Sequence, residues 1–224
     1  MQHTSEAGAA VYSPLTLKLY DAWVLGISNQ WAWQCPTRQV LLPFFRRHVG
    51  FRHMDVGVGT GYYLAKAQLP HSTAVTLVDL NASSLETARR RLNRASTRVI
   101  QHDVFQPLPA ELLGRYDSIS LFYLLHCLPG SMSEKAHVFA NLKHALAEGG
   151  VLYGATILGD EAGHNGFGSK LMDVYNKKGI FGNRLDTVEG LRQALVLHFA
   201  DVEIEVVGKV ALFTAKMPLL SDNM

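Results

Sequence analysis

Cysteine is scarce in this sequence, and long apolar runs are missing. The two cysteines, Cys35 and Cys127, stand in neither a C-x-x-C pair nor the Cys/His spacing of a metal site, so we expect no disulfide framework and no bound metal. No stretch approaches the roughly 18 consecutive apolar residues that a membrane span needs. The first residues also lack the basic segment of a signal peptide. The prediction is therefore a cytoplasmic protein without membrane contact.

An excess of one charge sign is absent too. The 224 residues carry 21 Lys and Arg against 19 Asp and Glu, and 48% of them are hydrophobic. This composition excludes general disorder and allows one domain with a sizeable core. It also disfavours a nucleic-acid binder driven by charge, because such proteins concentrate basic residues against phosphates. One basic cluster exists, consisting of Arg89, Arg90, Arg91, Arg94 and Arg98. Apolar residues on the other face of its helix favour a solvated outer surface over a phosphate-binding face.

Short apolar runs alternate with helical patterns from residue 51 onward. Strands are predicted at residues 51–56, 74–80, 98–101, 116–125 and 151–158. Between them, Ser83 with Glu86 and Ser131 with Glu134 have the spacing of a capping box at a helix start, and the glycine pair 149–150 is a stop signal. Strands and helices that alternate in this way predict a parallel sheet covered on both faces.

The end of the chain breaks this alternation. Two strand patterns, 202–207 and 210–215, are joined so tightly that they must be antiparallel. We therefore predict an α/β fold, a Rossmann-like doubly wound sheet of about seven strands that is mostly parallel with a C-terminal antiparallel hairpin. The chain divides into an N-terminal helical lid (1–50), a main domain (51–217) with an insert at 159–186 before a helix that begins near Thr187, and a flexible tail (218–224).

The most informative stretch is the glycine-rich segment 55–61 (DVGVGTG), between a predicted strand and a predicted helix at 62–69. Glycines there let the chain turn sharply and let a ligand approach the backbone. Alone the segment is a weak signal, because a tight turn explains it as well. The third glycine comes one position too early for a dinucleotide fingerprint, and the lysine of a phosphate-binding loop is missing.

Two carboxylates add to that signal. Asp79 follows the second predicted strand, where a carboxylate can accept hydrogen bonds from both hydroxyls of a ribose. Asp103 follows the third predicted strand and is placed to accept from an exocyclic amine such as that of adenine. Both positions belong to the edge where parallel strands end, which is where open α/β sheets bind ligands.

In this order, the sequence resembles the class I S-adenosylmethionine-dependent methyltransferases of the small-molecule type. The segments that carry the resemblance are DVGVGTG at 55–61, VDLN at 78–81, HDVF at 102–105, YDSISLFYLLHCLPG at 116–130 and EGGVLYG at 148–154. The resemblance is close over 51–158 and looser over 187–217. It implies that residues 51–217 bind S-adenosyl-L-methionine and release S-adenosyl-L-homocysteine.

The resemblance also implies a set of cofactor-binding residues. In the family, the glycine loop packs against the methionine part, the acid after the second strand holds the ribose, and the Asp after the third strand contacts the adenine amine. Apolar residues after both strands wall the adenine, and aromatics at the end of the fourth strand line the cofactor. Matched to this sequence, the set is Asp55, Gly57, Gly59, Gly61, Asp79, Leu80, Asp103, Val104, Phe122 and Tyr123.

The cofactor motif leaves the methyl acceptor open. Methyl transfer is an in-line displacement that orientation and exclusion of water can support, and a general base helps when the acceptor is a hydroxyl. His126 is the candidate base, with a structural histidine as the alternative. The stretch 122–125 lacks the Asn/Asp-Pro-Pro-aromatic sequence of enzymes that methylate adenine amines or glutamine amides. Cys127 lacks the Pro-Cys context of a nucleophile, so we expect a buried apolar cysteine.

The N-terminal segment holds all three tryptophans and looks like the helical lid of small-molecule methyltransferases. Its aromatics either enclose the cofactor cation and a flat acceptor, or only attach the lid to the core. Tyr20 and Trp33 are the residues expected to face the cofactor. The acceptor is expected to contact Tyr12, Trp23, His164, Asn165 and Phe167, although His164 could also be a solvated loop residue. Lid and insert should close over one cleft.

The leading hypothesis is a metal-independent methyltransferase of secondary metabolism that acts on O, N or S of a small, largely apolar or aromatic metabolite. We expect a monomer or homodimer with no nucleic-acid partner. One alternative is an RNA or protein methyltransferase, which only the arginine cluster supports. Another is a protein that binds the cofactor without turnover, and a third is a nicotinamide oxidoreductase on the same fold.

Overall fold

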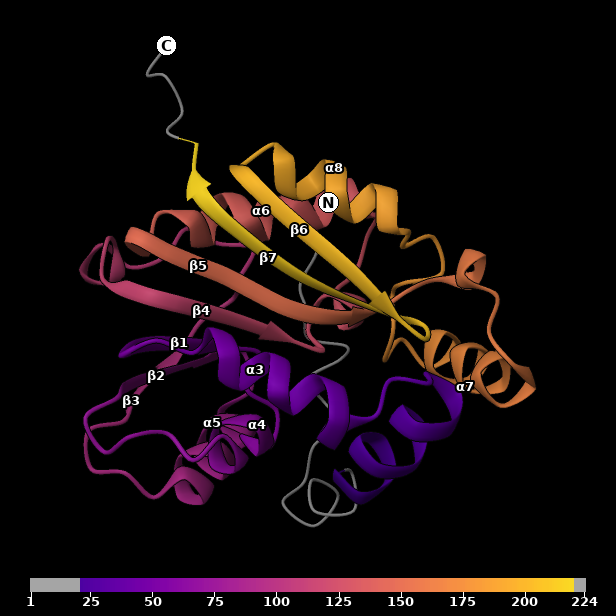
Figure 1. Ribbon diagram of the computed structural model, residues 1–224, viewed down its shortest axis with the longest axis horizontal. Helices are drawn as coiled ribbons and strands as arrows, with labels where there is room; N and C mark the ends of the chain where they lie inside the picture. The colour runs from indigo at the N-terminus through magenta and orange to yellow at the C-terminus, as the bar shows by residue number, and fades with distance from the viewer. Residues whose placement is uncertain (1–20, 220–224) are drawn as a thin grey trace.

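The computed structural model describes residues 21–219, with side chains from residue 25 onward. Tyr12, Tyr20 and most of the expected tail lie outside these residues, and so does the side chain of Trp23. The chain between them forms three layers, with a twisted sheet in the middle and helices on both faces (Figure 1). This arrangement is the predicted one.

The sheet has seven strands in the order β3-β2-β1-β4-β5-β7-β6. Its strands are β1 (Arg52–Val56), β2 (Ala74–Asp79), β3 (Arg98–Gln101), β4 (Tyr116–Phe122), β5 (Leu146–Ile157), β6 (Phe199–Val207) and β7 (Val210–Pro218). The first five run parallel, whereas β7 lies antiparallel between β5 and β6. The α/β class, the mostly parallel sheet and the C-terminal hairpin are therefore confirmed.

Helices cover the two faces unequally. On one face lie α6 (Met132–Lys143) and α8 (Val188–Val196), whose buried residues include Phe139 and Leu195. On the other face lie α3 (Leu42–His48), α4 (Tyr62–Lys66) and α5 (Ala82–Leu92). The helical segments η1 (Asp21–Ala32) and η2 (Thr37–Leu41) extend this second layer, and α7 (Gly166–Lys177) packs beside η1. The short turns η3 (Ala110–Leu112), η4 (Leu125–Cys127) and η5 (Asp160–Ala162) complete the helical elements.

The helix boundaries confirm one capping box and correct another. Ser131 caps α6, and its N–H donates to Glu134 Oε2 over 2.7 Å. Helix α5, by contrast, begins one residue before the predicted box, because Asn81 Oδ1 accepts the N–H of Ser83 over 2.8 Å. The prediction for Ser83 and Glu86 was wrong. An asparagine satisfies the first N–H groups as well as serine does, so both patterns fit the sequence.

The glycine pair 149–150 does not end a helix. Helix α6 has already ended at Lys143, and the pair lies inside β5. A Cβ at Gly150 would meet the carbonyl oxygen of Tyr116 at 2.8 Å, so this glycine lets β5 approach β4. The insert 159–186 contains helix α7, which the glycine-rich composition concealed. The helix after the insert begins as predicted, with Thr187 as the N-cap of α8.

Candidate functional site

A cleft opens where β1 to β4 end, the edge at which open α/β sheets bind ligands. Its lining residues come from the loops after these strands and from two covering segments. They are Leu25, Gly57, Val58, Gly59, Thr60, Tyr62, Tyr63, Asp79, Leu80, Asn81, Ser84, His102, Val104, Phe122, Tyr123, Leu124, Cys127, Leu128 and Ile180. Seven of the ten residues that the family resemblance implies at the sheet edge are in this set. The other three, Asp55, Gly61 and Asp103, lie behind or beside the cleft.

The three glycines of the loop after β1 serve different purposes. Gly57 and Gly59 line the cleft with φ angles of +72° and +51°, a region that side chains disfavour. A Cβ at Gly59 would meet no atom within 4 Å, so the loop leaves open space on the ligand side. Gly61 does not line the cleft. A Cβ there would lie 2.9 Å from Ala88, so Gly61 allows α4 to pack against α5.

Asp79 is the acidic group that lines the cleft. It ends β2, and its Oδ1 accepts the N–H of Asn81 over 2.8 Å. Burial raises the pKa of Asp79 to about 6, and hydrogen bonds from the N–H groups of Asn81 and Gly59 hold it below a still higher value. At neutral pH the group is therefore a carboxylate in a sheltered position, which suits it to accept hydrogen bonds from a pair of hydroxyls.

Asp55 lies behind the glycine loop in a buried chain of hydrogen bonds between β1 and β4. The Ser120 hydroxyl donates its proton to the Asp55 carboxylate. The Ser120 oxygen therefore acts as the acceptor for His53 Nε2–H, 3.1 Å away. His53 Nδ1 then accepts from the Ser118 hydroxyl, 2.8 Å away. Burial raises the pKa of Asp55 to about 7 and lowers that of His53 to about 3. The chain holds β1, and hence the loop that follows it, against β4.

The loops after β2 and β3 form a largely apolar compartment. Leu80 and Val104 both line the cleft, as the resemblance implies. Asp103 does not, because its Oδ1 accepts the N–H of Phe105 over 3.0 Å in a turn of its own loop. The neighbouring His102 lines the cleft instead. Contact between Asp103 and a ligand stays a prediction.

Phe122 and Tyr123 line the cleft at the end of β4, and their contact with a cofactor stays a prediction. The ring of Phe122 packs against that of Tyr63, with centroids 4.7 Å apart. Tyr123 has a φ of +61°, which is uncommon for a residue with a side chain. Its hydroxyl donates to Asn29 Oδ1 of η1 over 2.9 Å. The end of β4 is therefore tied directly to the N-terminal segment.

His126 lies behind the cleft and is only 2% exposed. Its Nδ1 accepts the backbone N–H of Ile157 over 3.3 Å, and its ring packs edge-on against Phe181. Burial lowers its pKa to about 3, helped by the charge of Lys135. A neutral imidazole whose Nδ1 is occupied carries its proton on Nε2 and cannot accept another there. This geometry favours the structural alternative over the general base.

Cys127 does line the cleft, but as a thiol. Burial raises its pKa to about 12, and the Sγ lies 3.6 Å from the carbonyl oxygen of Tyr123, to which it donates. The thiolate is the nucleophilic form of cysteine, so this environment is not that of a nucleophile. The group adds apolar surface to the wall of the cleft, so Cys127 is half-buried at the cleft and not fully buried in the core.

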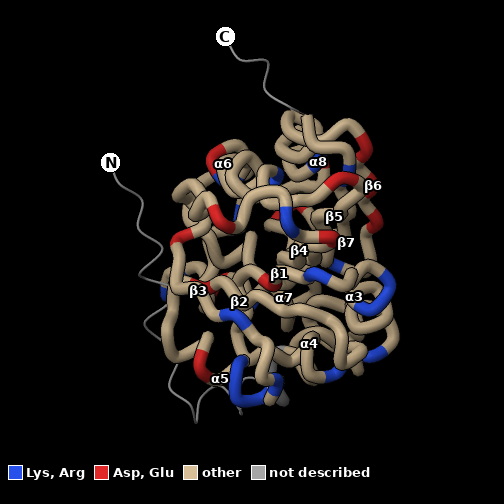
Figure 2. The backbone as a smooth tube through the Cα atoms, turned by 90° about the vertical axis from the view of Figure 1, so that its left-hand side faces the viewer, with Lys and Arg blue, Asp and Glu red and all other residues tan. Residues whose placement is uncertain are grey.

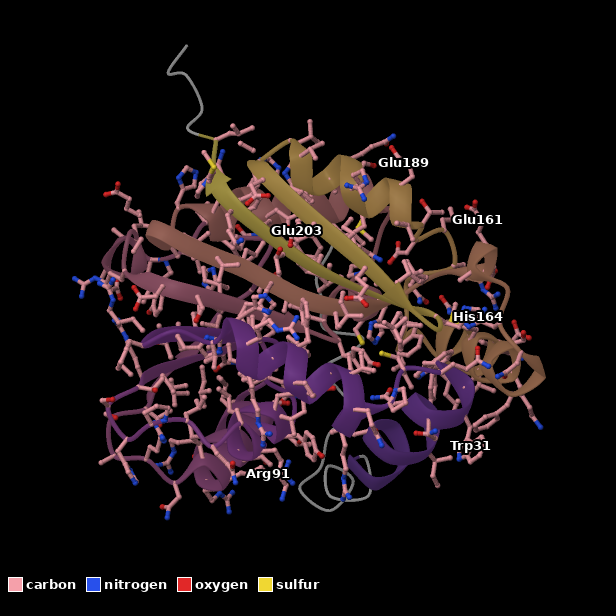
Figure 3. The ribbon with its side chains drawn as sticks, viewed as in Figure 1. Trp31, Arg91, Glu161, His164, Glu189 and Glu203 are labelled. Carbon is pink, nitrogen blue, oxygen red and sulfur yellow. The ribbon has the colours of Figure 1, made fainter. Side chains whose placement is uncertain are left out.

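The lid does not present Trp33 to the cleft. The indole is 1% exposed and packs edge-on against His164, with ring centroids 5.5 Å apart. The expectation that Trp33 faces the cofactor is therefore corrected, because its ring attaches the lid to the insert. Figure 3 shows His164 beside α7 and Trp31 on the adjacent lid segment.

The insert residues expected at the acceptor also lie elsewhere. His164 Nε2 is 3.0 Å from the carbonyl oxygen of Gly159, so the ring fastens its own loop. Asn165 caps α7, and its Nδ2 donates to the carbonyl oxygen of Trp31 over 2.8 Å. Phe167 is exposed, and none of the three lines the cleft. Within the part of the chain that the structure describes, Leu25 and Ile180 are the residues by which lid and insert reach the cleft.

Sequence reasoning missed Leu25 and Ile180 because single aliphatic residues outside a motif carry no signal. The positions of Asn81 and Ser84 could have been predicted from the sequence. Asn81 belongs to the VDLN segment that carries the family resemblance, and both residues lie where α5 begins. Thr60 and Tyr62 belong to the glycine loop and the start of α4, and their contact with the cleft follows from the loop's path.

The arginine cluster of α5 is used within the protein. Arg89 and Arg90 pair with Glu86 at 3.0 and 2.9 Å, and Arg98 pairs with Glu111 at 3.1 Å. Arg91 and Arg94 donate to the loops before and after α4. In Figure 2 the basic segments gather at α5, while acidic and basic segments are interspersed elsewhere on that side. A solvated face with structural arginines accounts for the cluster.

Two further findings concern ligands and membranes. Among residues 25–219, no three His, Cys, Asp or Glu side chains are grouped closely enough to hold a metal ion. No helix within the described chain is both long enough and apolar enough to span a bilayer.

The cleft fits S-adenosylmethionine by its chemistry. Gly59 leaves open space on the ligand side of the loop, Asp79 supplies an acceptor for hydroxyls, and Leu80 with Val104 supplies apolar walls for a flat base. A family model described as a methyltransferase domain matches residues 54–152, which include these groups.

Known relatives cover nearly the whole chain. The uncharacterised protein YbcY of Escherichia coli (strain K12) is 51% identical over 85% of this chain and 98% of its own. The physcion biosynthesis cluster O-methyltransferase of Aspergillus chevalieri is 44% identical over 96% of this chain and 97% of its own. Other fungal relatives are named as O- or N-methyltransferases.

Among solved structures, that of DhpI with S-adenosylhomocysteine aligns with a TM-score of 0.65 at 15% identity, over 95% of this chain and 96% of that one. At that identity the likeness speaks for the fold alone. The sheet order, the cleft and the relatives together show that the chain belongs to the class I S-adenosylmethionine-dependent methyltransferases and is related to fungal O- and N-methyltransferases.

Proposed function

We propose that this methyltransferase moves the methyl group of S-adenosylmethionine to an oxygen or nitrogen of a small, largely apolar metabolite. The observation that carries the proposal is the cover of the cleft. Leu25 of η1 and Ile180 of the insert line the cleft together with Cys127 and Leu128, which follow β4. An apolar lining of this kind suits a small molecule, which buries most of its surface on binding. The names of the fungal relatives support the same acceptor class.

Each part of the cofactor has a proposed partner. Asp79 accepts the two ribose hydroxyls, Leu80 and Val104 wall the adenine, and the glycine loop, with its open side at Gly59, receives the methionine part. Bound S-adenosylmethionine supplies a methyl group on a positively charged sulfur, which any well-placed lone pair can attack. The chain's contribution is then to align the acceptor and exclude water, with Tyr123 at the end of β4 as one wall.

A strong general base is not part of the proposal. His126 lies behind the cleft with its Nδ1 occupied, and Cys127 is held as a thiol. The preferred acceptors are therefore amines and acidic hydroxyls such as phenols, which give up a proton without strong assistance. Sulfur acceptors remain within the same chemistry. The proposed assembly is a monomer or a homodimer.

The test is a transfer assay. The purified protein is incubated with methyl-labelled S-adenosylmethionine and, in separate reactions, with a small-metabolite extract, total RNA and a protein extract. We expect label in the small-molecule fraction, together with S-adenosylhomocysteine. Label confined to RNA or protein would overturn the acceptor class. Binding of the cofactor without any product would identify a protein that binds without turnover. The expected cytoplasmic location is checked separately by cell fractionation.

A further inference from the structure

A buried chain of hydrogen bonds joins two walls of the cleft. The Tyr123 hydroxyl donates to Asn29 Oδ1 over 2.9 Å, and Asn29 Nδ2 donates to Thr37 Oγ1 over 2.8 Å. The Thr37 hydroxyl then donates to the carbonyl oxygen of Leu25 over 2.5 Å. The chain begins at a residue that lines the cleft from β4 and ends at one that lines it from η1. Asn29 lies in the middle and is fully buried.

The direction of every donor in this chain follows from the chemistry of the amide. The oxygen of Asn29 can only accept and its nitrogen can only donate. Tyr123 must therefore donate its single hydroxyl proton to Asn29, and Thr37 must accept from Asn29 and pass its own proton to Leu25. Only one arrangement satisfies all four groups. Because Asn29 and Thr37 are buried, water does not replace a lost partner without rearrangement of the lid.

The hydrogen bond between Tyr123 and Asn29 also bears on the backbone conformation of Tyr123. Its φ of +61° places a bulky residue in the left-handed region, which surrounding contacts have to hold. One of these contacts is the backbone hydrogen bond of its N–H to Ala155 O, at 2.8 Å, and another is the side-chain bond to Asn29. Removing Asn29 would release the ring of Tyr123 and the turn that carries Leu25 at the same time.

We propose that Asn29 is a positioning residue that sets the Tyr123 ring and the Leu25 side chain around the bound cofactor. Cofactor binding and attachment of the lid segment are thereby coupled, since both depend on the same buried amide. The inference rests on the cofactor site of the proposed function but not on its acceptor. It also assigns a role to a lid residue that carries no family motif in the sequence.

The experiment is calorimetric titration of variants with S-adenosylhomocysteine, which needs no acceptor. Asn29→Ala removes the hydrogen bonds to both Tyr123 and Thr37 and should raise the Kd about tenfold. Ser28→Ala is the matched control. Ser28 precedes Asn29 in η1 and is equally buried, but its Oγ has no hydrogen-bond partner within the described chain. This control should bind within about twofold of the parent.

A second pair of variants tests the chain at its other end. Thr37→Val removes the hydroxyl at nearly constant shape and should weaken binding, whereas Thr37→Ser keeps the hydroxyl and should restore it. Adding Tyr123→Phe to Asn29→Ala should cost little more than Asn29→Ala alone, because the two groups share one bond. Should Asn29→Ala fail to fold, the Thr37 pair still decides.

Two outcomes would overturn the proposal. One is a folded Asn29→Ala protein that binds S-adenosylhomocysteine as tightly as the parent. The other is an equal loss in Ser28→Ala, which would assign the effect to packing of η1 rather than to the hydrogen bonds. Failure of the proposed function is separable. A parent protein that binds S-adenosylhomocysteine but labels no small molecule would leave this test intact.

Discussion

The cleft is built by two regions that are held in place by different means. One is the sheet edge, the loops after β1 to β4, and the other is the cover, which consists of the described part of the lid (21–50) and the insert (159–186). At the sheet edge, backbone geometry places the groups: Gly57 and Gly59 turn the loop after β1, and Asp79 stands at the end of β2 held by backbone N–H groups. In the cover, side chains hold other side chains. Asn29 joins η1 to β4, and Lys135 with Asp186 joins α6 to the end of the insert. The sheet edge therefore requires particular residue types at particular positions. The cover requires only pairs of side chains that can bond to each other.

This difference has a consequence for stability and for binding. A buried pair in the cover is costly to break singly, because the remaining partner is left without compensation. Groups at the sheet edge are positioned by backbone geometry and backbone hydrogen bonds. Their replacement should therefore change the ligand site more than the stability of the fold. Substitutions in the two regions should therefore separate into those that change unfolding and those that change cofactor affinity.

The largest effect is expected at Lys135 of α6, which anchors the insert part of the cover through Asp186. Its Nζ donates to Asp186 Oδ2 over 2.6 Å, and both side chains are fully buried. Lys135→Met should lower the free energy of unfolding by about 3–5 kcal/mol, measured by urea denaturation. Replacing both partners, with Asp186→Leu added, should recover most of that loss. The control is Lys216→Met, whose pair with Asp201 is half-exposed and 3.8 Å long. Equal losses in both single variants would remove the distinction drawn for the cover.

At the sheet edge, Asp79→Ala should act on binding. Two hydrogen bonds from ribose hydroxyls to a carboxylate are worth about 3 kcal/mol together, so the Kd for S-adenosylhomocysteine should rise about a hundredfold. Calorimetric titration measures this value. Asp117→Ala is the control, since Asp117 pairs with Arg52 at the opposite end of the sheet. Undiminished affinity in Asp79→Ala would show that the ribose role is wrong.

The same contrast explains how much could be predicted from the sequence. The alternation of strands and helices, the terminal hairpin and seven of the residues that line the cleft follow from patterns that the backbone enforces. Prediction failed where several residue types can do the same work. Asn81 rather than Ser83 caps α5, and the glycine pair in β5 serves strand packing rather than a helix end.

In the cover, prediction failed for a further reason. Aromatic residues such as Trp33 are equally suited to a ligand wall and to a buried contact between segments, and the choice depends on how lid and insert meet. The sequence indicates no role for Asn29, because its two side-chain partners, Thr37 and Tyr123, lie 8 and 94 positions away along the chain. Contacts of this kind become visible only in three dimensions.

A pH titration is expected to give an effect of intermediate size, and it tests whether Asp79 at the sheet edge acts on binding. The pKa of Asp79 is raised from its ordinary 3.8 to about 6 by burial, so the folded protein binds a proton more tightly than the unfolded chain. As pH falls from 6 toward 4, this group should stabilise the fold by about 1.4 kcal/mol per unit and weaken cofactor binding about tenfold per unit. Stability and affinity thus move in opposite directions.

The check is to measure Tm and the Kd for S-adenosylhomocysteine across that pH range, in the parent and in Asp79→Asn. In the variant, which has no proton to exchange at this position, the affinity trend should flatten and the stability trend should become shallower. Asp55, with a pKa raised from 3.8 to about 7 by burial, also holds a proton in the folded protein that the unfolded chain lacks between pH 6 and 4, so it adds to the stability trend in both proteins. Because Asp55 lies behind the cleft, the affinity trend is the one that reports Asp79. Trends that persist unchanged in Asp79→Asn would assign the titration to another group.

The smallest effect belongs to the outer face of α5, which lies outside both regions. Arg90 pairs with Glu86 at the surface, so Arg90→Gln should change the free energy of unfolding by less than about 0.5 kcal/mol and leave S-adenosylhomocysteine binding unchanged. Arg91 is the informative partner on the same helix, labelled in Figure 3, because its guanidinium donates over 2.8 Å to the Thr60 hydroxyl of the glycine loop. Arg91→Gln should weaken binding severalfold, since Thr60 lines the cleft. A loss of RNA affinity in Arg90→Gln would instead make α5 a nucleic-acid face, and the division into sheet edge and cover would then have to include a third functional surface.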